Sequence, residues 1–135
     1  MVDTRNDLLK RAKGFVGRWH CCTPPPAPSG ITASAGGGSG EVMVTWDPLP
    51  ATARIAFSRV YRVKSDGTLY HLAVVLPSAV GLLEPGRLGI VDAPDYWPWP
   101  TIDDGTGQRC YRVSAVSQRG LEGPMSGQAC ATPTT

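Results

Sequence analysis

The sequence predicts an all-β protein, a seven-stranded sandwich preceded by a short amphipathic helical arm. Short apolar segments alternate with turns along most of the 135 residues, and 16 glycines and 13 prolines supply those turns. This pattern favours many short strands over a helical bundle. Apolar residues at helical spacing occur only near the N-terminus, ahead of a proline-rich stretch. We therefore expect one domain with an appendage.

Residues 1–22 are predicted to form the arm, with its helix between Thr4 and Trp19. Gly14 and Gly17 weaken this helix, so it is marginal in isolation. It could bind a membrane, dock into a groove of a partner protein, or pack on its own sandwich. The short, glycine-interrupted stripe disfavours the membrane, and we expect docking into a partner. The predicted docking residues are Leu8, Leu9, Ala12, Phe15, Val16 and Trp19.

Residues 23–30 are predicted to be a linker. The run Thr23-Pro-Pro-Pro-Ala-Pro-Ser-Gly30 contains four prolines. Proline lacks the backbone N–H that helices and sheets require, so this run cannot join either. We expect a stiff, extended spacer between the arm and the sandwich.

The first five strands are expected between residue 31 and residue 91. In the second of them, Val42, Val44 and Trp46 alternate with more polar positions, so one face brings a large indole into the core. Ser65-Asp66-Gly67 is a strong hairpin turn between the third and fourth strands. The predicted strands are residues 31–35, 42–46, 56–63, 69–76 and 87–91, with a longer excursion at residues 77–86.

The closing segment, residues 108–130, has the clearest strand pattern of the chain. Apolar and polar residues alternate, a turn follows near Gly120, and a returning strand completes a hairpin. These last two strands bring the expected total to seven, at the spacing of a sandwich. One face of the first strand carries Tyr111, Val113 and Ala115, and the other carries Cys110, Arg112 and Ser114.

Two cysteines lie in this hairpin. A turn centred near Gly120 places Cys110 opposite Cys130. Such a pair either forms a cross-strand disulfide, worth ~2–4 kcal/mol, or remains two reduced thiols. We expect the disulfide in oxidised protein, with a stabilising role and no role in catalysis.

These segments, in this order, resemble the fibronectin type III domain. The resemblance covers about residues 29–133 and implies an immunoglobulin-like sandwich, a fold that serves recognition and spacing more often than catalysis. Domains of this family occur in bacteriophage virion proteins. The resemblance lies in the entry Pro26-x-Pro-Ser-Gly-Ile-Thr-Ala-Ser34, in Val44-Thr-Trp46-Asp-Pro, in Val60-Tyr-Arg62 before Ser-Asp-Gly, in Val91-Asp92-Ala, and in Tyr111-x-Val113-x-Ala-Val.

Two features depart from this family. Ser58 stands where the family usually has an aromatic residue, with Phe57 beside it, so we expect a bulge or a shifted register in the third strand. The connection of residues 94–105 is longer and more aromatic than usual. Its Tyr96, Trp97 and Trp99 form a proline-stiffened platform that covers the end of the sandwich, contacts a protein, or stacks on a sugar ring.

Enzyme chemistry finds little support in the sequence. The run His20-Cys21-Cys22 lacks the second ligand pair of a zinc site, and adjacent cysteines chelate one ion poorly. No nucleophile elbow and no glycine-rich phosphate loop occur. We expect a non-enzyme with no cofactor and no metal.

The charge and hydropathy of the chain limit the classes of partner that we expect. The net charge is +2, which does not indicate nucleic acid, and no apolar run is long enough to span a membrane or to form a secretory signal. We expect a structural protein of a bacteriophage virion, a minor tail or capsid decoration component. It would be present in multiple copies in a symmetric particle and joined to other virion proteins by its arm. The alternative is an extracellular module that binds cell-surface glycan through Trp97 and Trp99.

Overall fold

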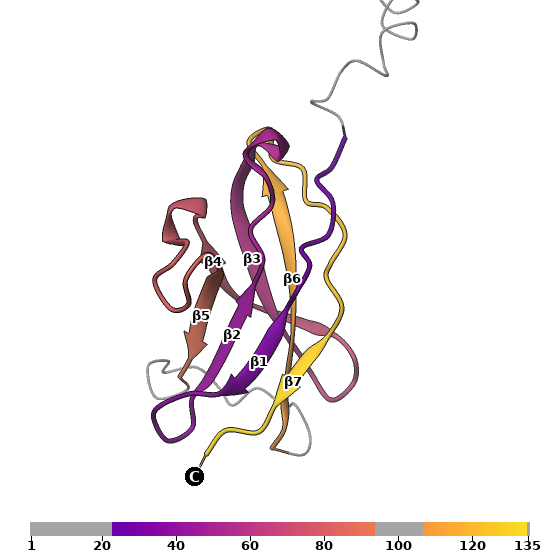
Figure 1. Cartoon of the computed structure of the whole chain (residues 1–135). Coiled ribbons are helices and arrows are strands. Elements are labelled where there is room, and N and C mark those ends of the chain that lie inside the picture. Colours follow the sequence, from indigo (N-terminus) through magenta and orange to yellow (C-terminus); the bar gives the residue numbers. More distant parts are fainter. Residues whose placement is uncertain (1–22, 94–106, 135) are drawn as a thin grey trace, which may run out of the picture.

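The computed structural model describes residues 23–93 and 107–134. Within these ranges, seven strands form two antiparallel sheets, and the predicted all-β fold is confirmed (Figure 1). The predicted helical arm of residues 1–22 lies outside the described residues, as do Tyr96, Trp97 and Trp99 of the aromatic connection.

The two sheets pack face to face as a sandwich. The three-stranded sheet has the order β1-β2-β5, and the four-stranded sheet has the order β4-β3-β6-β7. Two single-turn 3-10 helices, η3 (Ala51–Ala53) and η4 (Pro77–Ala79), lie in connections. The strands are β1 (Thr32–Ala35), β2 (Val42–Trp46), β3 (Ile55–Val63), β4 (Leu69–Val75), β5 (Leu88–Asp92), β6 (Arg109–Ser117) and β7 (Ala129–Ala131).

The core lies between the sheets and contains the side chains that the alternation of apolar and polar residues placed on the inner faces of the strands. Trp46 and Tyr111 are its largest fully buried members. Ser114 departs from the simple alternation: it points to the outer face of β6, yet it is fully buried there and donates a hydrogen bond to Glu122. The other buried core side chains include Val42, Val44, Val60, Val75, Leu88 and Val113.

The third strand carries the irregularities that its sequence predicted. The register of β3 shifts opposite β6 between Ile55 and Phe57, and it shifts opposite β4 between Val60 and Tyr61. Ser58, between the two shifts, faces the core and is buried. The extra residue lies on β3 at the first shift and on β4 at the second, and an extra residue increases the local twist of the strand pair.

Candidate functional site

The linker lies against the sandwich, which corrects the prediction of a spacer. Pro25 and Pro28 are both buried. A Cβ atom at Gly123 would collide with the backbone oxygen of Pro25, so only glycine allows this close approach. The backbone N–H of Asp47 donates to the carbonyl oxygen of Ser29 at 2.9 Å. Residues 23–30 are therefore part of the domain.

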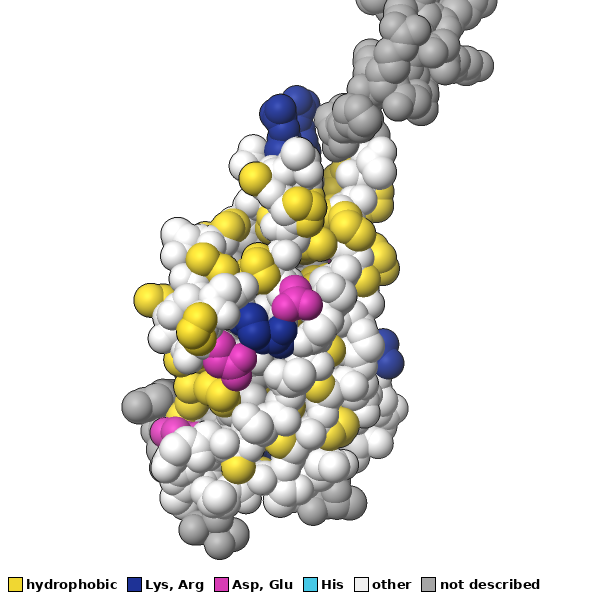
Figure 2. Space-filling view, viewed as in Figure 1, with side chains coloured by type: hydrophobic (Ala, Val, Ile, Leu, Met, Phe, Trp, Pro, Cys, Tyr) yellow, Lys and Arg dark blue, Asp and Glu magenta, His cyan; other side chains and the backbone are white. Residues whose placement is uncertain are grey.

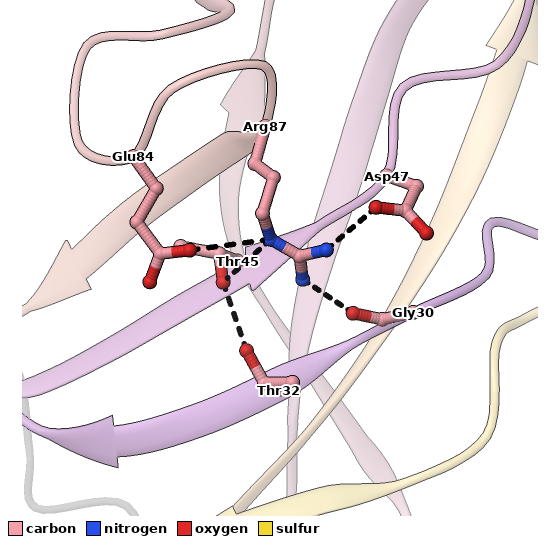
Figure 3. Close-up of polar contacts among 6 residues, drawn as sticks. All are labelled: Gly30, Thr32, Thr45, Asp47, Glu84 and Arg87. Atoms are coloured by element: carbon pink, nitrogen blue, oxygen red, sulfur yellow. Dashed lines mark hydrogen bonds and ion pairs between the residues drawn. The ribbon is translucent and has the colours of Figure 1, made fainter.

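A single guanidinium group, that of Arg87, holds the end of the linker (Figure 3). Its Nη2 donates to the carbonyl oxygen of Gly30, and its Nη1 lies 2.5 Å from Oδ1 of Asp47. Its Nε donates to Oγ1 of Thr45 at 3.3 Å and lies 3.3 Å from Oε2 of Glu84. One side chain thus joins the linker, β2 and the β4–β5 connection.

The consequence is a fixed point of attachment. Because Gly30 is held by Arg87 and Pro25 is held against Gly123, whatever precedes residue 23 joins the sandwich at a defined place. We call the set Pro25, Pro28, Gly30, Arg87 and Gly123 the linker junction. The linker junction was not predictable from local sequence, since Arg87 follows an ordinary Pro-Gly turn.

A cavity of about 30 Å³ lies beside the linker junction. The small side chain of Ser58 and the indole of Trp46 both line it. The buried Nε1 of Trp46 has no hydrogen-bond partner in the described part of the chain. Ligand pockets usually enclose about 300–1,000 Å³, so this cavity is a packing feature and not a binding pocket. Its lining includes Pro28, Trp46, Pro48, Leu49, Ile55, Ser58, Pro77 and Leu88.

The β4–β5 connection exposes aliphatic side chains. Leu82 is 78% exposed, yet backbone hydrogen bonds order the chain around it. The N–H of Gly81 donates to the carbonyl oxygen of Arg87 at 2.9 Å, and the N–H of Ala79 donates to that of Leu76 at 3.0 Å. Figure 2 shows hydrophobic side chains exposed around a small cluster of basic and acidic groups on this face. We call Leu76, Val80, Leu82 and Leu83 the apolar loop.

The outer face of the four-stranded sheet holds a second polar group, centred on Glu122. Its carboxylate accepts hydrogen bonds from Tyr61 at 2.5 Å, from Ser114, and from Arg59 at 3.3 Å. Burial opposes the charge, but the hydrogen bonds from Ser114 and Tyr61 and the positive charge of Arg59 lower the pKa of Glu122 below its ordinary value. Glu122 therefore accepts these hydrogen bonds as an ionised carboxylate.

A third cluster is buried at the end of β5, directly before the aromatic connection. The side chain of Asp92 is fully buried and accepts a hydrogen bond from the hydroxyl of Tyr111 at 2.5 Å. Arg62 and Arg109 place guanidinium nitrogens 3.6 Å and 3.9 Å from the same carboxylate oxygen. Burial, and then the neighbouring charge of Asp92, raise the pKa of Tyr111 well above its ordinary value.

The two cysteines of the closing hairpin face each other across β6 and β7 and form a disulfide. This places Cys110 and Cys130 in the register that the turn near Gly120 predicts. Since β7 has only three residues, the disulfide holds a strand that few backbone hydrogen bonds secure. Its role is structural.

The described residues offer no metal centre. Across residues 23–93 and 107–134, no three histidine, cysteine, aspartate or glutamate side chains group so that they could hold an ion. The run His20-Cys21-Cys22 lies outside these ranges. None of the helices in the described ranges is long and apolar enough to cross a membrane.

Comparisons with known proteins give little. No protein-family model matches the chain, and no curated protein matches it. Among solved structures, it is similar to a β-1,2-glucanase from Parabacteroides distasonis, with a TM-score of 0.49 and 19% sequence identity. That match covers 83% of this chain and 13% of the glucanase. A similarity of this size says nothing of what this chain does.

Proposed function

We propose that this chain is a non-enzymatic structural and binding component of a large assembly. The assembly is a bacteriophage virion, in which the chain is a minor tail or capsid decoration protein. The arm of residues 1–22 anchors it in a partner protein, and a fibronectin type III-like sandwich forms the displayed part. The ordered set of segments from Val44-Thr-Trp46 to Tyr111-x-Val113 supports the family, since they lie on strands of two facing antiparallel sheets.

The observation that carries this proposal is the linker junction. A spacer that moved freely would cost conformational entropy each time the arm docked, and a linker held in place avoids that cost. Arg87 and Gly123 both hold the linker, at Gly30 and Pro25. A fixed attachment suits a protein whose sandwich must take one orientation in every copy of a symmetric particle.

Deletion of residues 1–22 tests the anchoring. The expected result is a folded, soluble sandwich that no longer copurifies with the particle when it is made in the producing host. A sharper pair is Phe15→Asp on the apolar stripe and Lys10→Asp on the opposite side of the predicted helix. Phe15→Asp should abolish incorporation and Lys10→Asp should leave it unchanged. Normal incorporation of the deletion would reject the proposal.

Glycan binding through Trp97 and Trp99 is the second candidate. The observation that favours it is a hydrogen bond between the two strands that flank that connection. Asp92, the last residue of β5, accepts this bond from the hydroxyl of Tyr111, near the start of β6. Rigid anchors reduce the entropy lost on binding. Titrating the full chain with host cell-wall polysaccharide should change its tryptophan fluorescence, and Trp97→Ala should remove the change. Trp19→Ala is the control, and an unchanged response in Trp97→Ala would exclude this role.

A further inference from the structure

The outer face of the four-stranded sheet carries a row of three neighbouring side chains, those of Tyr61, His71 and Arg112. Tyr61 on β3 pairs with His71 on β4 and with Arg112 on β6. The ring centroids of Tyr61 and His71 lie 5.3 Å apart. These side chains come from the three longest strands of the sandwich, so the row has a rigid base.

Arg112 is the unsatisfied member of this row. It is half-buried, and no other residue in the described ranges forms a hydrogen bond or ion pair with it. Its neighbour Arg59 differs, because Arg59 is bound to Glu122. Glu122 is the carboxylate of this face, and it already accepts three hydrogen bonds. The face therefore presents one guanidinium group with its hydrogen-bonding capacity free.

Apolar side chains border the row. Val74 is 50% exposed and Leu69 is 39% exposed, both on β4, and Phe57 on β3 lies under the guanidinium group of Arg59 at 5.5 Å. Arginine and aromatic residues are enriched in protein interfaces and dominate their binding energy. A free arginine beside a held tyrosine, within an apolar border, has the composition of such an interface.

We propose that this face binds a protein partner that presents a carboxylate between apolar side chains. The carboxylate pairs with Arg112, and the apolar groups cover Val74 and Leu69. Arginine matches a carboxylate with two parallel hydrogen bonds, which gives both affinity and orientation. A polysaccharide fits less well, because the rings of Tyr61 and His71 are inclined at 56° and offer no common stacking plane. This contact is separate from the arm and does not rest on its docking.

Titration of the ¹⁵N-labelled full chain with a short soluble peptide tests the proposal. The peptide has one aspartate between two leucines, and its matched control has asparagine instead. Amide shifts should change at Arg59, Tyr61, His71 and Arg112 with the aspartate peptide. Arg112→Gln should weaken binding about tenfold, the effect of losing one charged hydrogen-bonding partner. Arg119→Gln, an exposed arginine on the turn after β6, should bind as the wild type does.

Several outcomes would overturn the proposal. Equal binding of both peptides would show that the carboxylate is not recognised. Absence of amide shifts at millimolar peptide would show that this face does not bind the peptide. Tighter binding of oligogalacturonate than of the aspartate peptide at the same residues would assign the face to an anionic polysaccharide. Unchanged thermal unfolding of Arg112→Gln shows that its lost affinity does not come from lost folding.

Discussion

Two of the arginine–carboxylate clusters in the described part of the sandwich differ in burial. Around Asp92, the carboxylate is fully buried, and the guanidinium groups of Arg62 and Arg109 are 7% and 15% exposed. Around Arg87, the carboxylates of Asp47 and Glu84 are 52% and 37% exposed. Both clusters join arginine side chains to carboxylates, but the carboxylate of the first is shielded from water and those of the second are in contact with it.

This difference in medium decides what each cluster does. Water screens exposed ion pairs, so an isolated surface pair contributes little. A buried charge that loses its partners costs several kcal/mol because it cannot regain water. We infer that the Asp92 cluster fixes the fold at the start of the aromatic connection, whereas the Arg87 cluster positions the linker at small energetic gain.

Removing the buried carboxylate should have the largest effect. Asp92→Ala leaves the hydroxyl of Tyr111 and two guanidinium groups without the carboxylate that they share. We expect the free energy of unfolding to fall by about 3–5 kcal/mol, measured by urea denaturation. Asp92→Asn keeps the shape and loses the charge, so it should fall between Asp92→Ala and the wild type. A loss below 1 kcal/mol in Asp92→Ala would place this cluster with the surface pairs.

The disulfide should rank second. Cys110 and Cys130 are 20 residues apart, and closing a loop of that length in the unfolded chain is worth about 3 kcal/mol. The double variant Cys110→Ser with Cys130→Ser should unfold at correspondingly lower urea concentration. Reduced wild type is the matched control, since it should behave as the double variant does. Equal midpoints for reduced and oxidised wild type would contradict the expected contribution.

The third-largest expected effect is a loss of stability at alkaline pH, caused by Tyr111 in the buried Asp92 cluster. The pKa of Tyr111 is raised in the folded state above its ordinary value of 10.0. Above that pH the unfolded chain ionises Tyr111 while the folded chain keeps the proton. The stability is therefore complete below pH 10 and declines above it, by ~1.4 kcal/mol for each pH unit.

Tyr111→Phe isolates this effect from the other tyrosines. Urea midpoints of wild type and variant, measured from pH 8 to pH 11, should converge as the pH rises above 10, because the variant has no such proton to lose. Parallel curves over the whole range would show that Tyr111 does not couple ionisation to folding.

The Arg87 cluster should show the smallest effect. Arg87→Gln is expected to lower the free energy of unfolding by about 1 kcal/mol, and 1 M salt should remove most of the difference by screening. Asp92→Ala should keep its deficit in the same salt. The variant should also increase amide exchange at Ser29 and Gly30, because the linker loses its contact with Nη2. A salt-independent deficit of Arg87→Gln would erase the distinction between the clusters.

The alternation of apolar and polar residues predicted the strands because successive side chains of a strand point to opposite faces, one buried and one exposed. Val42, Val44 and Trp46 alternate and lie in the core. Of the five earlier predicted strands, one matches the observed bounds, three differ by one residue at one end, and the fifth is displaced by one residue. The strand positions need only local information, since alternation and turn residues act within a few positions. The irregular third strand was predicted differently, from Ser58 at a position where the family that the sequence resembles usually has an aromatic residue.

The candidate sites were harder to predict. Arg87 and Gly30 are 57 residues apart, and Tyr61 and Glu122 are 61 apart. Glu122 stands in a glycine- and proline-rich turn, where an acidic residue is ordinary. The exposed surface of the apolar loop has a sequence signal, because Leu82 and Leu83 are apolar within a segment of turn residues.

The sequence by itself determined the class of the fold, the order of its strands and the side chains of its core. These follow from side-chain alternation and from turn chemistry, which are properties of neighbouring residues. The tertiary structure alone decided that the proline-rich linker packs on the domain and that Asp92 is buried among two arginines and a tyrosine. It also decided that Arg112 has no partner among the residues that the structure describes. The reason is that pairing and burial of charge depend on which strands become neighbours, and sheet order joins residues that the chain keeps far apart.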